Sequence, residues 1–159
     1  MKSCLVVCYS RTGITDGVAS RIAADCACDI ERIRDPRPRG GLSGYLRSIF
    51  EAVTGRLPEV GPAARNPGDY ELVILGTPVW AGHVSSPMRA YIRANGDRFG
   101  QVAAFCTMGG SGGDKVLDEI AALCNKRLLA RLVLTAKEIR LDADGEKIGL
   151  FTRGAAAPG

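Results

Sequence analysis

The sequence predicts an α/β fold in which a five-stranded parallel sheet carries helices on both faces. Two observations lead to this prediction. Apolar, strand-like runs alternate along the chain with segments whose apolar residues recur at helical spacing. The central runs are continuously apolar, which is typical of strands covered on both faces. Parallel neighbours need a crossover between them, and the intervening helices supply it.

The composition is that of an ordinary globular chain. Its 159 residues are 46% hydrophobic and 24% charged, enough to bury one core, so we predict one domain over residues 1–159. The net charge of +4 is mild and predicts no nucleic-acid partner. The longest stretch free of charge and strong polarity, Leu72–Gly82, is far shorter than a membrane span, and the first residues lack the pattern of a signal peptide. We therefore predict a cytoplasmic protein with no membrane partner.

The six cysteines are predicted to be free thiols. In a reducing compartment, small buried thiols are more common than disulfides. Cys26 and Cys28 are too close together for half of a zinc knuckle, and the chain has no second pair or extra histidine to complete one. No metal site is predicted.

The first strand is predicted over Lys2–Tyr9, an apolar run that polar Ser10 ends. A helix follows to about Asp25. Its apolar residues at helical spacing are Val18, Ala19, Ile22 and Ala23. Cys28–Arg34 alternates weakly as the second strand, and the segment 35–41, rich in Pro and Gly, breaks it.

The second helix is predicted to have Ser43 as its N-cap and to end at Gly55. One of its faces is apolar and is expected to pack on the core; it comprises Tyr45, Leu46, Ile49, Phe50 and Val53. Tyr45 and Phe50 could instead roof a ligand site. Residues 55–68, with three Pro and three Gly, are predicted to form an ordered surface loop.

The third strand is predicted over Glu71–Gly76, which contains Leu-Val-Ile-Leu. Ser86 is the predicted N-cap of the next helix, with Pro87 at its first position and Asn95-Gly96 as the stop. The fourth strand is predicted over Gln101–Thr107.

After a glycine cluster at 109–113, a fourth amphipathic helix is predicted from residues Val116, Leu117, Ile120, Leu123 and Cys124. Leu128–Thr135 is the fifth strand. Beyond it we predict only one short helix that turns Ile148 and Phe151 to the sheet, and a frayed tail from about residue 154. So short an ending would leave apolar surface for a second subunit, which would favour a homodimer.

The loop Ser10–Thr15 follows the first strand, where open α/β sheets bind ligands. A helix N-terminus offers unpaired N–H groups and partial positive charge, and Gly13 lets the backbone approach a ligand. The loop lacks the spacing of a Walker loop, a dinucleotide fingerprint or a Cys-x5-Arg phosphatase loop. It predicts a phosphate cradle, with simple capping of the helix as the alternative.

Two further loops follow the third and fourth strands. Thr77–Gly82 contains the only tryptophan, Trp80, on a predicted surface loop, where a planar ligand would explain its presence. Thr107–Gly113 has four glycines in seven residues, which leaves backbone amides free to bind a flat polar group.

Together these loops resemble those of the flavodoxin family. Ser10-x-Thr12-Gly13-x-Thr15 matches its phosphate signature Ser/Thr-x-Thr-Gly-x-Thr, and the two later loops resemble its flavin-ring loops. The resemblance covers residues 2 to about 136. It implies a three-layer flavodoxin-like sandwich with strand order 2-1-3-4-5, bound FMN, and a redox protein that carries electrons through the flavin.

The resemblance also implies a role for each residue of the three loops. The FMN phosphate would be held by Ser10, Arg11, Thr12, Gly13, Ile14 and Thr15. The isoalloxazine, with Trp80 stacked or edge-on against it, would be flanked by Thr77, Pro78, Val79, Trp80, Ala81 and Gly82. Its pyrimidine end would be bound by Thr107, Met108, Gly109, Gly110 and Gly113. No residue is assigned a catalytic role.

The chain departs from the family's electron carriers in three ways. Its third loop has no aromatic residue to cover the second flavin face, and the chain is basic where those carriers are acidic around the flavin. A backbone carbonyl that turns toward the flavin needs a positive φ, which costs more at Ala81 than at glycine. An open flavin face would also suit a nicotinamide or a quinone, so an NAD(P)H-dependent FMN/quinone reductase is the alternative function.

The implied partners are a redox partner protein or NAD(P)H. His83, the only histidine, lies beside the implied ring edge and could relay a proton, although a solvated loop residue is the plainer interpretation. Arg37, Arg39 and Arg47 could contact a nicotinamide phosphate or an acidic protein, with a solvated face as the plainer interpretation.

Overall fold

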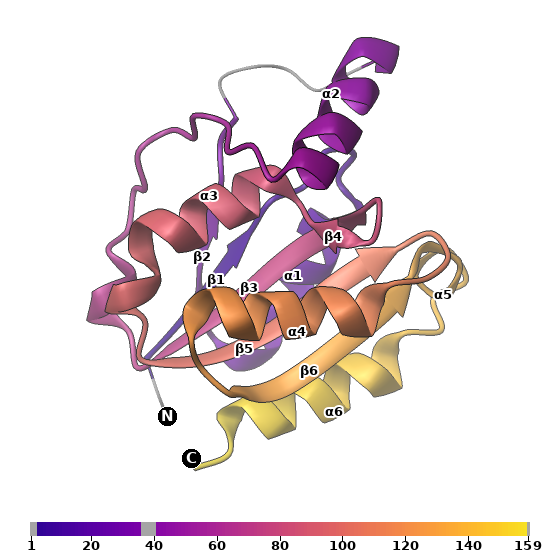
Figure 1. The fold of residues 1–159 in the computed structure, drawn as a ribbon. Helices are drawn as coiled ribbons and strands as arrows, with labels where there is room; N and C mark the ends of the chain where they lie inside the picture. Colours follow the sequence, from indigo (N-terminus) through magenta and orange to yellow (C-terminus); the bar gives the residue numbers. More distant parts are fainter. Residues whose placement is uncertain (1–2, 36–40, 159) are drawn as a thin grey trace.

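A computed structural model describes residues 3–35 and 41–158 (Figure 1). Its strands are β1 (Cys4–Cys8), β2 (Asp29–Arg32), β3 (Leu72–Trp80), β4 (His83–Val84), β5 (Gln101–Met108) and β6 (Leu128–Thr135). Its helices are α1 (Ile14–Cys26), α2 (Gly41–Thr54), α3 (Ser86–Asn95), α4 (Gly113–Cys124), α5 (Ala136–Arg140) and α6 (Gly145–Ala156), with 3-10 turns η1 (Pro67–Asp69) and η2 (Gly96–Arg98). Arg37 and Arg39 lie outside the described residues.

Five strands form one parallel sheet in the order β2-β1-β3-β5-β6. All four pairings on this path are parallel. Because β4 is a short addition beside β3, this is the order 2-1-3-4-5 of the five predicted strands. The predicted fold class is confirmed.

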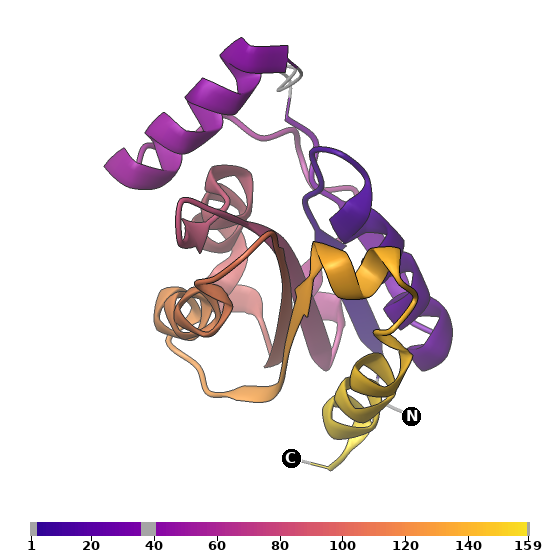
Figure 2. The same cartoon turned by 90° about the vertical axis from the view of Figure 1, so that its right-hand side faces the viewer.

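Helices cover both faces of the sheet, which gives three layers (Figure 2). On one face α3 and α4 bury a core with the sheet that includes Met88, Ile92 and Leu117. On the other face α1 and α6 bury a second core around Phe105 and Ile22. The central strands β1, β3 and β5 are therefore apolar on both faces, as their continuous apolar runs predicted.

The third strand is longer than predicted. It continues through Thr77–Trp80 instead of stopping at Gly76, so most of the predicted second loop is strand. Val79 and Trp80 pair antiparallel with β4, and this short hairpin was missed in the sequence. Pro78 and the two-residue turn after Trp80 are typical of loops. The sequence therefore did not predict that β3 extends through this segment.

The orientation of α2 corrects the sequence prediction. The helix already begins at Gly41, so Ser43 is not its N-cap, and its buried residues are Gly44, Ser48, Glu51 and Ala52. The apolar face predicted to pack on the core is turned outward instead. Tyr45 and Phe50 are about half exposed, so the prediction that they are core residues is wrong.

The C-terminal part is more ordered than predicted. Two helices, α5 and α6, replace the single short helix, and α6 reaches Ala156 where a frayed tail was expected from about residue 154. Ile148, Phe151 and Ala155 are buried against the sheet and α1, because they lie at the spacing of one helical face. Leu150 points outward and is exposed. A helix of this length thus covers the sheet surface expected to stay open.

One pair of cysteines is joined, which corrects the prediction of six free thiols. Cys4 and Cys28 form a disulfide, and the remaining four cysteines are free. The register explains the pairing: Leu5 lies opposite Asp29 in the parallel pair β1–β2, so the residues just before them are neighbours. In the described parts of the chain, no helix combines the length and the apolar character that crossing a bilayer requires.

Candidate functional site

A cavity of about 610 Å³ lies at the carboxyl ends of β1, β3 and β5. This size is within the range of small-molecule and cofactor sites. It is lined by Arg11, Thr12, Ile14, Thr15, Tyr45, Ser48, Ile49, Pro78, Val79, Trp80, Ala81, Thr107, Met108, Gly109 and Ala136. All three predicted loops contribute, so the fold brings together segments about 65 and 30 residues apart along the chain, as parallel sheets do with their carboxyl ends.

The first loop is shaped to leave a helix N-terminus open. Gly13 is the N-cap of α1 at φ +95°, a left-handed conformation that favours glycine, and no side chain caps the helix. The Gly13 N–H donates to Ser10 Oγ at 3.0 Å, which closes the loop on itself. The first amides of α1 thus remain available beside the cavity, where an anion would be stabilised.

The second loop is a tight hairpin turn. Trp80 pairs with His83, which leaves Ala81 and Gly82 as the two turn residues, at φ +50° and +77°. Two successive positive φ values are what a type I′ hairpin requires. The sequence predicts that a positive φ at Ala81 is unfavourable, but Ala81 has φ +50° because the hairpin imposes it.

The third loop, like the first, ends in a glycine N-cap with a positive φ. Gly112 is the N-cap of α4 at φ +94°, again without a side-chain cap. A Cβ on Gly112 would lie 3.3 Å from the Cα of Gly82, so the second and third loops touch through glycine backbones. The first and third loops are also joined, since the buried hydroxyls of Thr15 and Thr107 lie 2.9 Å apart. The cavity is therefore framed by mutually supporting loops.

Two aromatic side chains line the cavity from different sides. Trp80 is 9% exposed and packs edge-on against Tyr9, with ring centroids 5.5 Å apart, above Ala52 of α2. Tyr45 of α2 is 48% exposed and carries the Arg11 guanidinium over its ring at 5.7 Å. Trp80 is thus a fixed wall, while Tyr45 stands at the rim.

The cavity is lined mainly by uncharged side chains. Among the lining residues within the described ranges, Arg11 is the one with a charged side chain, and no carboxylate or histidine is present. His83 does not line the cavity: its Nδ1 lies 3.5 Å from Glu119 Oε2. Arg89 donates to the other oxygen of the same carboxylate at 2.7 Å. His83 therefore belongs to a polar cluster against α4 and not to the cavity.

Not every predicted site residue reaches the cavity. Eleven of them line it, and the six that do not are Ser10, Gly13, Thr77, Gly82, Gly110 and Gly113. Ser10, Gly13 and Gly82 shape their turns, as described above. Thr77 is fully buried and its hydroxyl lies 2.8 Å from that of Ser85, the residue that caps α3 in place of the predicted Ser86. A Cβ on Gly113 would lie 2.4 Å from Val133, so this glycine lets α4 approach β6.

Three lining residues were not among the predicted site residues: Ser48, Ile49 and Ala136. Ser48 and Ile49 share the side of α2 that carries Tyr45, three and four residues earlier. The possibility that Tyr45 covers a ligand site was thus the signal that pointed to Ser48 and Ile49. Ala136 follows β6 directly, and no motif in the sequence points to it.

The fold and the position of the cavity define a flavodoxin-like α/β protein. Among solved structures the chain is similar to a flavoprotein from Lactobacillus acidophilus NCFM in complex with FMN, with 19% identity, a TM-score of 0.73, and coverage of 89% of this chain and 98% of that one. It is also similar to oxidised flavodoxin 1 from Bacillus cereus, with 14% identity, a TM-score of 0.58 and 99% coverage of both chains.

The same fold occurs within a larger protein. Rubredoxin oxygen:oxidoreductase from Desulfovibrio gigas matches with 15% identity and a TM-score of 0.52, over 98% of this chain and 37% of that one. No family model matches the chain. At these identities the likeness establishes the flavodoxin-like fold, and the function rests on the site.

Proposed function

We propose that this protein binds FMN in the cavity at the carboxyl ends of β1, β3 and β5 and carries electrons through it. One observation carries the proposal: the uncapped N-terminus of α1, opened by Gly13, borders a cavity whose lining includes a cation and, among the described residues, no carboxylate. Such a site attracts an anionic ligand with a flat, polar ring system. The FMN complex of the Lactobacillus acidophilus flavoprotein, which shares the fold, supports the choice of ligand.

The residues present fit FMN at both of its ends. The phosphate would lie on the amides that open α1, with Thr12 and the Arg11 guanidinium beside it. The ring would lie between the hairpin segment 78–81 and the loop 107–109, with Trp80 as a wall. Bound FMN supplies the redox chemistry, while the chain orients it and excludes water from one side.

The lining favours a carrier over an enzyme that moves protons. The Thr, Ser, Gly and apolar side chains of the cavity offer no group that titrates near neutral pH among the described residues. His83, which could have served, is held against Glu119 away from the cavity. Electron transfer through a bound flavin requires no such group, so this lining is sufficient for a carrier.

Binding is tested by titrating the apoprotein with FMN and with riboflavin, followed by flavin fluorescence. Arg11→Ala should weaken FMN about tenfold, since a charge-assisted contact of about 1.5 kcal/mol is lost, and should leave riboflavin nearly unchanged. Arg153→Ala, an exposed arginine of α6, is the matched control. A protein that binds neither flavin would refute the proposal.

The carrier role is tested by anaerobic addition of NADPH to the FMN-loaded protein. The proposal expects no bleaching of the flavin absorbance until a redox protein or a chemical reductant is supplied. Rapid bleaching by NADPH alone would contradict the carrier role and favour the NAD(P)H-dependent reductase.

A further inference from the structure

The outer side of α2 carries a stripe of large apolar side chains. We define the α2 stripe as Leu42, Tyr45, Leu46, Phe50 and Val53, continued by Leu57 just beyond the helix. Their exposed fractions run from 47% to 73%. The spacing of three and four residues places them along one side of the helix. In Figures 1 and 2, α2 lies at the periphery, and no other ribbon of the described chain covers its outer side.

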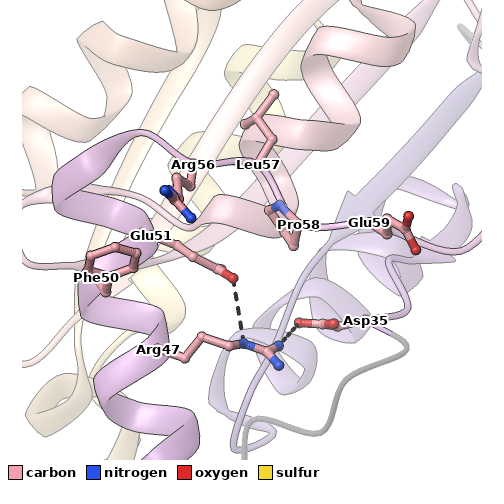
Figure 3. Close-up of a pocket in the computed structure, with 8 residues that line it drawn as sticks. All are labelled: Asp35, Arg47, Phe50, Glu51, Arg56, Leu57, Pro58 and Glu59. Atoms are coloured by element: carbon pink, nitrogen blue, oxygen red, sulfur yellow. Dashed lines mark hydrogen bonds and ion pairs between the residues drawn. The ribbon is translucent and has the colours of Figure 1, made fainter.

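Polar contacts on the inner side fix this orientation. Arg47 of α2 donates to Asp35 at 2.9 Å and lies 3.5 Å from Glu51, one helical turn later (Figure 3). Glu51 in turn accepts from Ser86 Oγ of α3 at 2.6 Å. Rotating the helix to bury the stripe would break these contacts. It would also expose the small and polar groups of the inner side to solvent. The stripe therefore faces outward because the sequence holds it there.

The α2 stripe has no charge of its own. The helix contains two charged residues, Arg47 and Glu51, and both are engaged on the inner side. Two cations lie beside the stripe: Arg11 lies over the Tyr45 ring and Arg56 lies over the Phe50 ring. A face whose own side chains are apolar, with charged groups only beside it, resembles the interfaces of permanent complexes, whereas transient partners meet through more polar surfaces.

We propose that two copies of this chain pair through their α2 stripes. A second copy is always present to cover a surface that is always exposed, whereas a transient partner would leave it in water for most of the time. Six side chains that each expose roughly 100 Å² give about 600 Å² per copy, so a pair buries about 1,200 Å², which reaches the size of a stable interface. Like stripes also match each other in a two-fold arrangement.

The pairing extends to the cofactor cavity. Tyr45 belongs to the stripe and also lines the cavity, together with Ile49 one turn further along α2. The second copy therefore lies against the open rim of the cavity, beside the residue that carries Arg11. This dimer goes beyond the proposed flavin binding and does not depend on it, because the stripe is complete in the apoprotein.

The experiment measures the molar mass of the apoprotein by light scattering and by sedimentation over a wide concentration range. The expected result is a dimer with a dissociation constant of about 1 µM or below. Leu46→Glu and Val53→Glu should each weaken the dimer at least about a hundredfold, because a charge is buried in both copies. Leu150→Glu, at an equally exposed leucine on α6, is the matched control and should remain dimeric.

Circular dichroism confirms that each variant is folded, and flavin titration shows separately whether the cavity functions. Rising salt should leave the dimer intact or strengthen it, since the two charges beside the stripe are both positive. A monomeric wild type overturns the proposal, as does a dimer that survives both α2 substitutions. A monomer that sediments with anionic lipid vesicles overturns it in favour of a membrane surface.

Discussion

Replacing Ala81 by glycine should stabilise the protein, although the same replacement usually destabilises. Ala81 has φ +50° in the hairpin turn that follows Trp80. A left-handed conformation costs an L-residue other than glycine about 1–2 kcal/mol. Replacing alanine by glycine relieves this strain. Glycine also gives the unfolded chain more conformational freedom, which offsets about 0.5–1 kcal/mol of the strain relieved. We expect Ala81→Gly to raise the free energy of unfolding by about 0.5–1 kcal/mol.

The matched control is Ala122→Gly in α4, where the alanine is exposed and helical. There glycine has no strain to relieve and should lower the free energy of unfolding by up to about 1 kcal/mol. Urea unfolding of the apoproteins, followed by circular dichroism, measures both changes at an unchanged m value. If Ala81→Gly destabilises as much as Ala122→Gly, the turn does not hold Ala81 in the left-handed region.

Gly76→Ala should destabilise by about 3 kcal/mol or more, because its Cβ would lie 2.1 Å from Phe105 Cζ, and adding Phe105→Leu should recover part of the melting temperature lost. A hydrogen bond from Lys147, and then the backbone N–H of Thr135, lower the pKa of Glu138 to about 2. Glu138 thus stabilises the fold above the ordinary pKa of 4.5, and this contribution is lost as the pH falls through about 2. The unfolding midpoints of wild type and Glu138→Gln should therefore differ at pH 7 and converge in acid. The disulfide predicts four thiols per denatured chain before reduction and six after it, by reaction with a thiol reagent. In the native protein Cys8 and Cys106 should resist that reagent at mild alkaline pH, because burial raises the pKa of each to about 12.

The sheet and the first and third loops could be predicted because their signals are local. Runs such as that of Val73–Leu75 are apolar at every position, and only a strand covered on both faces explains such a run. Gly13 and Gly112 stand directly before helical patterns, where a left-handed N-cap leaves amides open. Once parallel order is assumed, the loops that follow the strands must meet at one edge.

The features that could not be predicted depend on which element becomes the neighbour. Spacing shows that Leu46 and Val53 share a side of α2, but not whether that side meets the sheet or solvent. The answer came from Arg47 and Glu51, whose partners Asp35 and Ser86 lie on other elements. The disulfide likewise depends on the register of β1 against β2, and the β3–β4 hairpin on only two pairs of residues.

The contact between Thr15 and Thr107 makes the two ends of the cavity interdependent. These hydroxyls belong to the loop proposed to hold the phosphate and to the loop proposed to hold the ring, and they lie 2.9 Å apart in a buried place. A ligand fragment that orders one loop therefore prepares the other, so two fragments bound together should bind more tightly than the product of their separate affinities suggests. We therefore expect the cavity to favour a ligand long enough to contact both loops.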